Sequence, residues 1–328
     1  MKRDRATWLD ALKCLLIMFV VLGHALQWTI DPDCHSLMLK FIRSVQMPLF
    51  VFISGYLFRE GYNGNEIVSK VMRLLIPFFA WGLIKISMKC LLNPMFGFFD
   101  GIVKLFLNPQ SGLWFFWTLS FDMMIVFGVE LISMKLRINH FIFAFILCVV
   151  AFVSINGSGA KMFGIHQIVY YLPYFLLGRL CSKYKFNGNK TSRRNWTVLV
   201  LLCLVAWAAM ACFYEWKGLI QLPFSVQLSG ALAEGFRMFC AFCGAVGLFG
   251  LIQLNKRNKV FQFKMIMYIG RNTFGIYAVH CAIWSIFNWQ GFPSSLLFIL
   301  LIISSVVAIE MLQRNRWTAY MFLGKKAR

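Results

Sequence analysis

Long apolar runs alternate with short polar or turn-forming clusters along the whole chain, and this alternation predicts ten membrane-spanning helices. A helix needs about 20 mostly apolar residues to cross the hydrocarbon core of a bilayer. Runs near that length cover residues 11–30, 37–58, 72–92, 113–134, 141–154, 165–181, 196–214, 231–253, 270–289 and 294–312. The fifth and sixth runs are the short ones. The pattern predicts an all-α polytopic integral membrane protein.

The basic residues between these runs predict the orientation of the chain. Of the 33 Lys and Arg residues, 24 fall in loops on the side of both termini and only five in the opposite loops. Loops on the cytoplasmic side of membrane proteins are enriched in Lys and Arg. We therefore expect both termini in the cytoplasm and a multi-pass protein of the plasma (inner) membrane.

Composition excludes several classes of protein. The chain has 60% hydrophobic and 14% charged residues. A soluble enzyme has more charged residues to cover its surface, so this class is excluded. A net charge of +21 would suggest a nucleic-acid partner in a soluble chain, but here topology accounts for it, so no nucleic-acid partner is expected. We expect a single membrane domain over 1–328 without a fused soluble domain.

The cysteines predict neither a disulfide framework nor a zinc site. Nine of the ten lie within or at the ends of apolar runs, and only Cys34 falls in an expected outer loop. Cys240 and Cys243 form a CxxC pair with no second pair or nearby His, which is typical of small apolar packing residues. No metal is expected.

Three ionisable residues in the first run are the most informative, because each ionisable side chain in a membrane core is costly and persists for a reason. Asp10, Lys13 and His24 share one helix face, and His24 lies about 16 Å along the axis from Lys13. Asp10 and Lys13 can pair at the inner interface. His24 can serve as a packing hydrogen bonder or, since it titrates near neutrality, as a general base.

Five sequence blocks in order resemble the membrane acyltransferase-3 family, whose members O-acetylate sugars of cell envelopes. They are WLDALK with VVLGH at 8–24, MPLF with SGYLF at 47–58, the basic pair Lys70 and Arg73 ahead of a proline, LWFF at 113–116, and IGRNT with IYAVH at 269–280. Two positions depart from the family pattern. Gln46 stands where many members have His, and Lys70 replaces the first Arg of the basic pair.

The resemblance implies transfer of an acetyl group from cytoplasmic acetyl-CoA to a hydroxyl of an envelope glycan or lipid-linked sugar. His24 is then the expected general base, or less favourably the acyl carrier, while Lys13 and Asp10 fix the inner end of the site. Lys13 can instead contact the phosphates or pantetheine of the donor. The membrane lipids are the other expected partners.

Three basic residues are candidates for binding the donor phosphates. Lys70 and Arg73 lie on one helix face at the cytoplasmic mouth, and Arg271 sits at the expected start of the ninth helix, where free N–H groups favour an anion. Ordinary anchoring to the inner surface is the rival interpretation for all three. Further candidate site residues are Ser54, Tyr277 and His280, each of which could instead serve in helix packing. For Ser54 and its neighbour Gly55, close approach of two helices is the preferred interpretation.

Two other classes of function stay open at this stage. A transporter or flippase for a lipid-linked sugar or small anion would use the charged face of the first helix as a path, and a structural subunit would use the polar residues to join helices. The acceptor sugar, the acyl chain and the oligomeric state are not predicted. Partners are not assigned for the remaining charges in or near spans, Arg43, Arg237, Glu130, Glu234 and Glu310.

Overall fold

The computed structural model describes residues 7–29, 36–93, 95–158, 162–183, 190–284 and 289–325. Within them the chain forms thirteen α-helices and one antiparallel two-stranded hairpin, which confirms the predicted helical fold. The helices are α1 (Thr7–Thr29), α2 (Leu37–Leu57), α3 (Gly64–Leu92), α4 (Phe98–Leu107), α5 (Trp114–Leu136), α6 (His140–Ser158), α7 (Ile165–Lys183), α8 (Lys190–Ala211), α9 (Gly230–Leu254), α10 (Lys264–Arg271), α11 (Thr273–Trp284), α12 (Ser294–Gln313) and α13 (Arg316–Leu323). The strands are β1 (Ile220–Gln221) and β2 (Gln227–Leu228).

Among the described helices, seven are long and apolar enough to cross a membrane: α1, α2, α3, α5, α8, α9 and α12. The short predicted runs correspond to α6 and α7, of 19 residues each, which fall outside that set. The predicted run 270–289 is broken between α10 and α11. A polytopic helical membrane protein is thus supported, whereas ten crossings and the cytoplasmic placement of both termini stay predictions. Cys34 lies outside the described residues.

The chain folds into two compact units, each assembled from separate segments. The first comprises Met1–Phe50, Tyr184–Tyr277 and Trp289–Ile302, and the second comprises Val51–Lys183, Ala278–Asn288 and Ile303–Arg328. Helices α2, α11 and α12 each contribute residues to both units.

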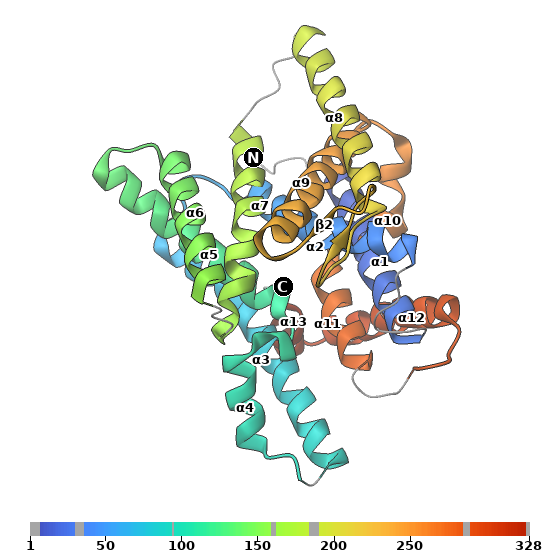
Figure 1. Ribbon diagram of the computed structural model, residues 1–328. Coiled ribbons are helices and arrows are strands. Elements are labelled where there is room, and N and C mark those ends of the chain that lie inside the picture. The colour runs from blue at the N-terminus through green and yellow to red at the C-terminus, as the bar shows by residue number, and fades with distance from the viewer. Residues whose placement is uncertain are drawn as a thin grey trace. The chain divides into compact units, whose positions relative to one another are not determined.

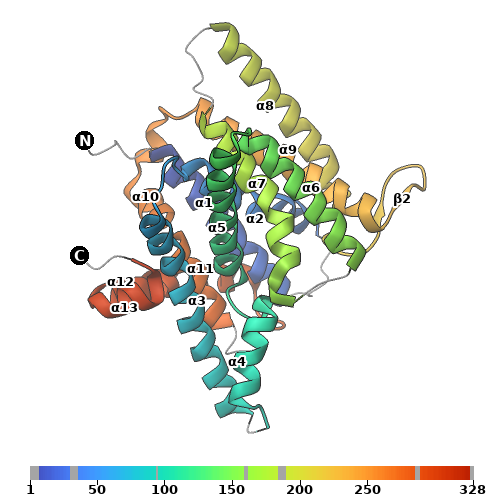
Figure 2. The ribbon, with the colours of Figure 1, turned by 90° about the vertical axis from the view of Figure 1, so that its left-hand side faces the viewer.

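In the first unit, α8 runs beside α9 (Figures 1 and 2) because small residues on α9 let the two helices approach. Gly244, Gly247 and Gly250 recur every three residues on one face of α9. A Cβ on Gly247 would lie 2.9 Å from a methyl carbon of Leu204, and one on Gly250 would overlap the side chain of Val200. The larger side chains of α8 therefore fill the notches on α9, as is common between membrane helices.

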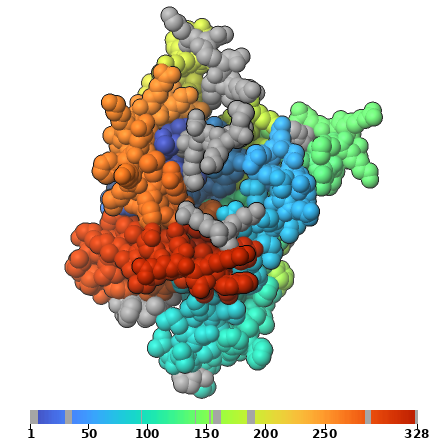
Figure 3. Space-filling view, turned by 180° about the vertical axis from the view of Figure 1, so that it is seen from behind, coloured from blue at the N-terminus to red at the C-terminus, as the bar shows by residue number. Residues whose placement is uncertain are grey.

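In the second unit, α3 and α4 lie side by side as a helical hairpin (Figures 1 and 2), and α5, α6 and α7 contact one another. Helix α3 starts with a capping box, since the Asn63 side chain accepts from Glu66 N–H and Glu66 accepts from Asn63 N–H. Figure 3 shows the dark red atoms of α13 beside the light blue atoms of α3. Trp81 Nε1 on α3 donates to the carbonyl of Phe322 on α13 at 3.0 Å.

Candidate functional site

Three of the predicted site residues meet at one end of α1 in the first unit. The Asp10 carboxylate accepts a hydrogen bond from Arg271 Nε at 3.2 Å and lies 4.0 Å from Lys13 Nζ. Asp10 is 1% exposed, so burial of its charge requires cationic partners. We call Asp10, Lys13 and Arg271 the α1 charge cluster.

A glycine brings Arg271 to Asp10. A Cβ on Gly270 would overlap the backbone carbonyl oxygen of Asp10, so only glycine lets α10 approach α1 this closely. The local helix start was predicted wrongly: Arg271 is the last residue of α10, and α11 begins at Thr273 rather than at Gly270. Arg271 therefore does not lie at a helix N-terminus. Its guanidinium is instead oriented by the buried carboxylate of Asp10.

Within the described residues, the α1 charge cluster holds more cations than carboxylates. Two cations face one carboxylate, and the side chains of Lys13 and Arg271 are 21% and 45% exposed. The cluster thus presents net positive charge at an accessible position. Such a position suits a polyanionic ligand such as a phosphate ester.

His24 lies on the same helix, eleven residues beyond Lys13. Its imidazole is half-buried and stacks on the Trp28 indole, with ring centroids 4.7 Å apart and an interplanar angle of 16°. The stacking sets the plane of the ring one turn before the end of α1. The structure therefore gives His24 a defined orientation within an apolar helix.

Tyr277 and His280 are three residues apart on α11 and so project from one face of that helix. Both are buried, at 6% and 0% exposure. They belong to different units of the chain, Tyr277 to the first and His280 to the second. Their roles stay predictions.

In the second unit, Lys70 and Arg73 on α3, the predicted donor-binding pair, have different surroundings. Lys70 Nζ lies 4.9 Å from the centroid of the Tyr62 ring, and the Arg59 guanidinium lies 5.8 Å from the same centroid. Arg73 Nε donates to the carbonyl of Gly324 at 2.6 Å, just past the end of α13. Among the described residues, the terminal nitrogens of Arg73 have no recorded partner. The bond through Nε fixes the guanidinium plane and leaves that edge for an anion.

Gly55 performs the packing role that was predicted for the Ser54–Gly55 step. A Cβ on Gly55 would overlap the carbonyl oxygen of Phe175 on α7, and one on Gly178 of α7 would overlap the carbonyl oxygen of Phe52 on α2. The two backbones are therefore in direct contact. The prediction of close helix approach at this step is confirmed.

Sequence reasoning missed the most buried cation of the second unit. Arg179, counted among the basic loop residues, is 2% exposed on α7. Its Nε donates to Glu130 on α5 at 2.6 Å, and a terminal nitrogen donates to the Phe58 carbonyl at 2.8 Å. Glu60 lies 3.8 Å from Arg179 and also pairs with Lys183. We call Arg179, Glu130, Glu60 and Lys183 the Arg179 network.

Asp122 on α5 was also overlooked. It is fully buried, and neither carboxylate oxygen has a hydrogen-bond partner among the residues that the structure describes. The signal was present in the sequence, because Asp122 is an acidic residue inside an apolar run.

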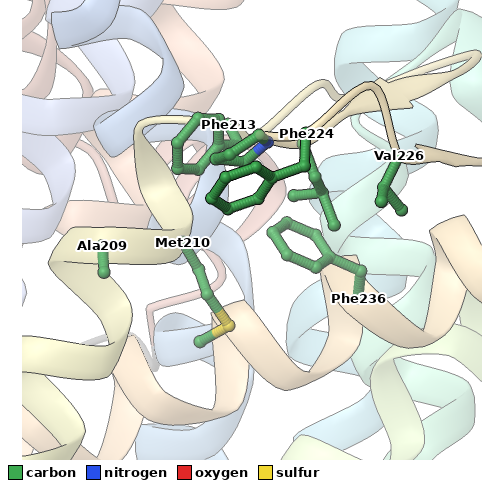
Figure 4. A pocket seen from close by; sticks show the side chains of 8 residues that line it. Ala209, Met210, Phe213, Phe224, Val226 and Phe236 are labelled. Carbon is green, nitrogen blue, oxygen red and sulfur yellow. The ribbon is translucent and has the colours of Figure 1, made fainter.

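None of the nine predicted site residues lines an apolar groove that the first unit contains. It has a volume of about 340 Å³ and is drawn in Figure 4. It is lined by Ala209, Met210, Phe213, Leu222, Pro223, Phe224, Val226 and Phe236. Nearby on the chain, burial raises the pKa of the Tyr214 hydroxyl. The lining supplies no polar side chain for acyl transfer.

Known proteins place these residues in a family. Residues 6–312 match the model of an acyltransferase domain. The nodulation protein NolL of Mesorhizobium japonicum is 27% identical over 218 residues, which is 63% of this chain and 55% of the relative. NolL of Sinorhizobium fredii is 28% identical over 228 residues, 65% of this chain and 58% of the relative.

The chain therefore spans a little more than half the length of the curated relatives it matches. No solved structure matches it. The family match, in contrast, runs across nearly the whole chain, including α1 and its charge cluster. On that evidence the chain belongs to the acyltransferase-3 family of membrane O-acyltransferases.

Proposed function

We propose that this protein transfers an acetyl group from acetyl-CoA to a hydroxyl of an envelope glycan or a lipid-linked sugar, with His24 as the general base. The observation that carries the proposal is that α1 holds two different functional groups at separate positions along its length. A titratable imidazole lies about 16 Å from a cluster with excess positive charge, on the same helix. The two ends offer a base for an acceptor hydroxyl and a cationic contact for a phosphorylated donor.

In the reaction, the neutral imidazole of His24 takes the proton of the acceptor hydroxyl as its oxygen attacks the thioester carbonyl. The carbon–sulfur bond breaks, and the CoA thiolate receives a proton as it leaves. A new ester forms on the glycan. The imidazole of His24 is half-buried and stacked on Trp28, so its ring is held in a defined plane for this proton transfer.

Donor binding is assigned to two groups of cations, each within its own unit. In the first unit, Lys13 and Arg271 supply positive charge beyond what Asp10 balances. In the second unit, and as a separate candidate, Arg73 offers a guanidinium edge oriented by its bond to Gly324, and Lys70 an ammonium held over Tyr62. Phosphate groups bind well to such preorganised cations.

Membership of the acyltransferase-3 family supports transfer chemistry over the transporter hypothesis. The family match, together with the two nodulation-protein relatives, supports acyl transfer to a polysaccharide-type acceptor. The inner membrane, expected from the basic loops, remains part of the proposal.

The test incubates purified protein in lipid nanodiscs with radiolabelled acetyl-CoA and a panel of free and lipid-linked glycans. Wild type is expected to label at least one glycan, and His24→Gln is expected to lose about a hundredfold or more in rate, because the base is absent. The matched control is His166→Gln, whose ring stacks on Tyr170 in α7. Normal transfer by a folded His24→Gln protein would refute His24 as the base.

A further inference from the structure

Gln46 on α2 carries a buried amide that the fold leaves unsatisfied. The residue is 9% exposed, and its Oε1 has no hydrogen-bond partner among the described residues. Buried polar atoms in folded proteins nearly always have partners, and one without a partner calls for an explanation. A methionine would fill a similar volume without the desolvation cost of the amide. Packing alone therefore does not account for a glutamine here.

The position of the amide suggests its purpose. Gln46 faces α1 within the first unit, where a Cβ on Gly23 would lie 3.6 Å from Gln46 Oε1 and 3.1 Å from Ile42 Cγ2. Gly23 has no side chain, so the Gln46 amide reaches the backbone of α1 at the residue directly before His24. The unsatisfied oxygen thus lies against α1 at the residue that precedes the proposed base in the chain.

The chemistry of the orphan atom restricts its ligand. An amide oxygen accepts hydrogen bonds, so the missing partner must be a donor. The acetyl thioester carries no N–H or O–H at the reacting group and cannot serve. A sugar hydroxyl can donate to Oε1 and at the same time accept from Nε2. At the reacting centre, the acceptor hydroxyls are therefore the groups that fit Gln46.

We propose that Gln46 binds the acceptor, with its amide holding a hydroxyl of the sugar next to the one that His24 deprotonates. The inference rests on the proposed function, because it takes His24 as the base and a glycan as the acceptor. It adds a specificity-determining contact on a second helix. The residue departs from the histidine that many related sequences place there, so its amide would adapt the site to a particular acceptor.

Two glutamines permit a matched test. Gln253 on α9 also has a buried Oε1 without a hydrogen-bond partner among the described residues, but it lies at the C-terminal end of α9, one residue before the last. Gln46→Met and Gln253→Met thus remove the same kind of buried amide. Both variants are expected to keep or raise the midpoint of thermal unfolding, because each loses an unsatisfied polar group.

Kinetics then separate the two positions. With the glycan that wild type acetylates best, Gln46→Met is expected to raise the acceptor KM about tenfold and leave the acetyl-CoA KM within twofold. Gln253→Met is expected to leave both values within twofold.

An unchanged acceptor KM in Gln46→Met would overturn the inference while leaving the proposed function intact. Failure of Gln46→Met to fold would also overturn it, because the amide would then be needed for structure. If wild type acetylates no glycan of the panel, the proposed function fails first and the role of Gln46 falls with it. The two failures are thus distinguishable.

Discussion

The α1 charge cluster and the Arg179 network are both groups of charges in apolar helices, yet they differ in charge balance and exposure. In the Arg179 network, two cations face two carboxylates, and Arg179 also binds a backbone carbonyl and lies 5.2 Å from the Phe58 ring centroid. In the α1 charge cluster, two cations share one buried carboxylate. Arg179 is almost completely enclosed, whereas the side chain of Arg271 is 45% exposed.

The difference indicates what each group does. The enclosed Arg179 has its Nε and a terminal nitrogen bound to Glu130 and to the Phe58 carbonyl, so it serves to hold α5, α7 and the end of α2 together. An open cluster with excess charge contributes less to the fold and keeps capacity for an anion. Charge in a membrane helix is thus a functional signal only after its partners have been counted.

The largest expected effect breaks the closed network. Arg179→Met leaves the Glu130 carboxylate and the Phe58 carbonyl without the guanidinium, and should lower the free energy of unfolding by about 3–5 kcal/mol. Chemical unfolding in detergent micelles measures the loss. Arg271→Gln in the same assay should cost less than Arg179→Met, because Arg271 is 45% exposed and Lys13 remains beside Asp10.

Two variants sharpen this result. Lys183→Met removes a cation from the exposed edge of the network, where Glu60 is 60% exposed, and should cost under about 1 kcal/mol. Adding Glu130→Gln to Arg179→Met should recover part of the loss, since the buried charge disappears. Equal losses in Arg179→Met and Arg271→Gln would remove the distinction between a closed and an open group.

The next effect concerns the glycines that bring each group together. Gly270→Ala and Gly178→Ala each place a methyl group against a backbone carbonyl oxygen, of Asp10 and of Phe52 respectively. Each should cost about 1–3 kcal/mol in the free energy of unfolding. Gly270→Ala should also weaken CoA binding, because α10 carries Arg271, whereas Gly178→Ala should not.

Matched controls come from glycines with open space around them. Gly235 on α9 and Gly128 on α5 have nothing within 4 Å of an added Cβ, so alanine there should be neutral or stabilise by up to about 1 kcal/mol. If Gly270→Ala proved as mild as Gly235→Ala, the close approach of α10 to α1 would be wrong.

Apolar runs were sufficient to predict the helical membrane fold, because the length of an apolar run directly reflects the need to cross hydrocarbon. The break between α10 and α11 was not predictable in the same way. Gly270 and Asn272 are poor helix formers that permit a break, but the contact of Gly270 with the α1 backbone became visible only in the fold. Helix α4 and the β1–β2 hairpin were missed because short elements between spans leave little periodic signal.

For the site, helix periodicity placed Asp10 next to Lys13, because both belong to one helix. The pairing of Asp10 with Arg271 joins residues 261 positions apart and required the fold. Arg179 was misjudged for the same reason, since a cation near the end of a run looks like an anchor until Glu130 is placed beside it. Ion pairs between side chains on different helices cannot be predicted from the hydrophobic pattern of either helix alone.

The most direct test of the open cluster is the affinity of wild type and variants for CoA, measured by calorimetry in nanodiscs. Lys13→Met combined with Arg271→Gln is expected to raise the Kd at least about tenfold, equivalent to about 1.4 kcal/mol. Lys40→Met, which removes a cation paired with Glu215 in the same unit, is the matched control and should leave the Kd within twofold. An unchanged Kd in the double variant would contradict the assignment of the α1 charge cluster to donor binding.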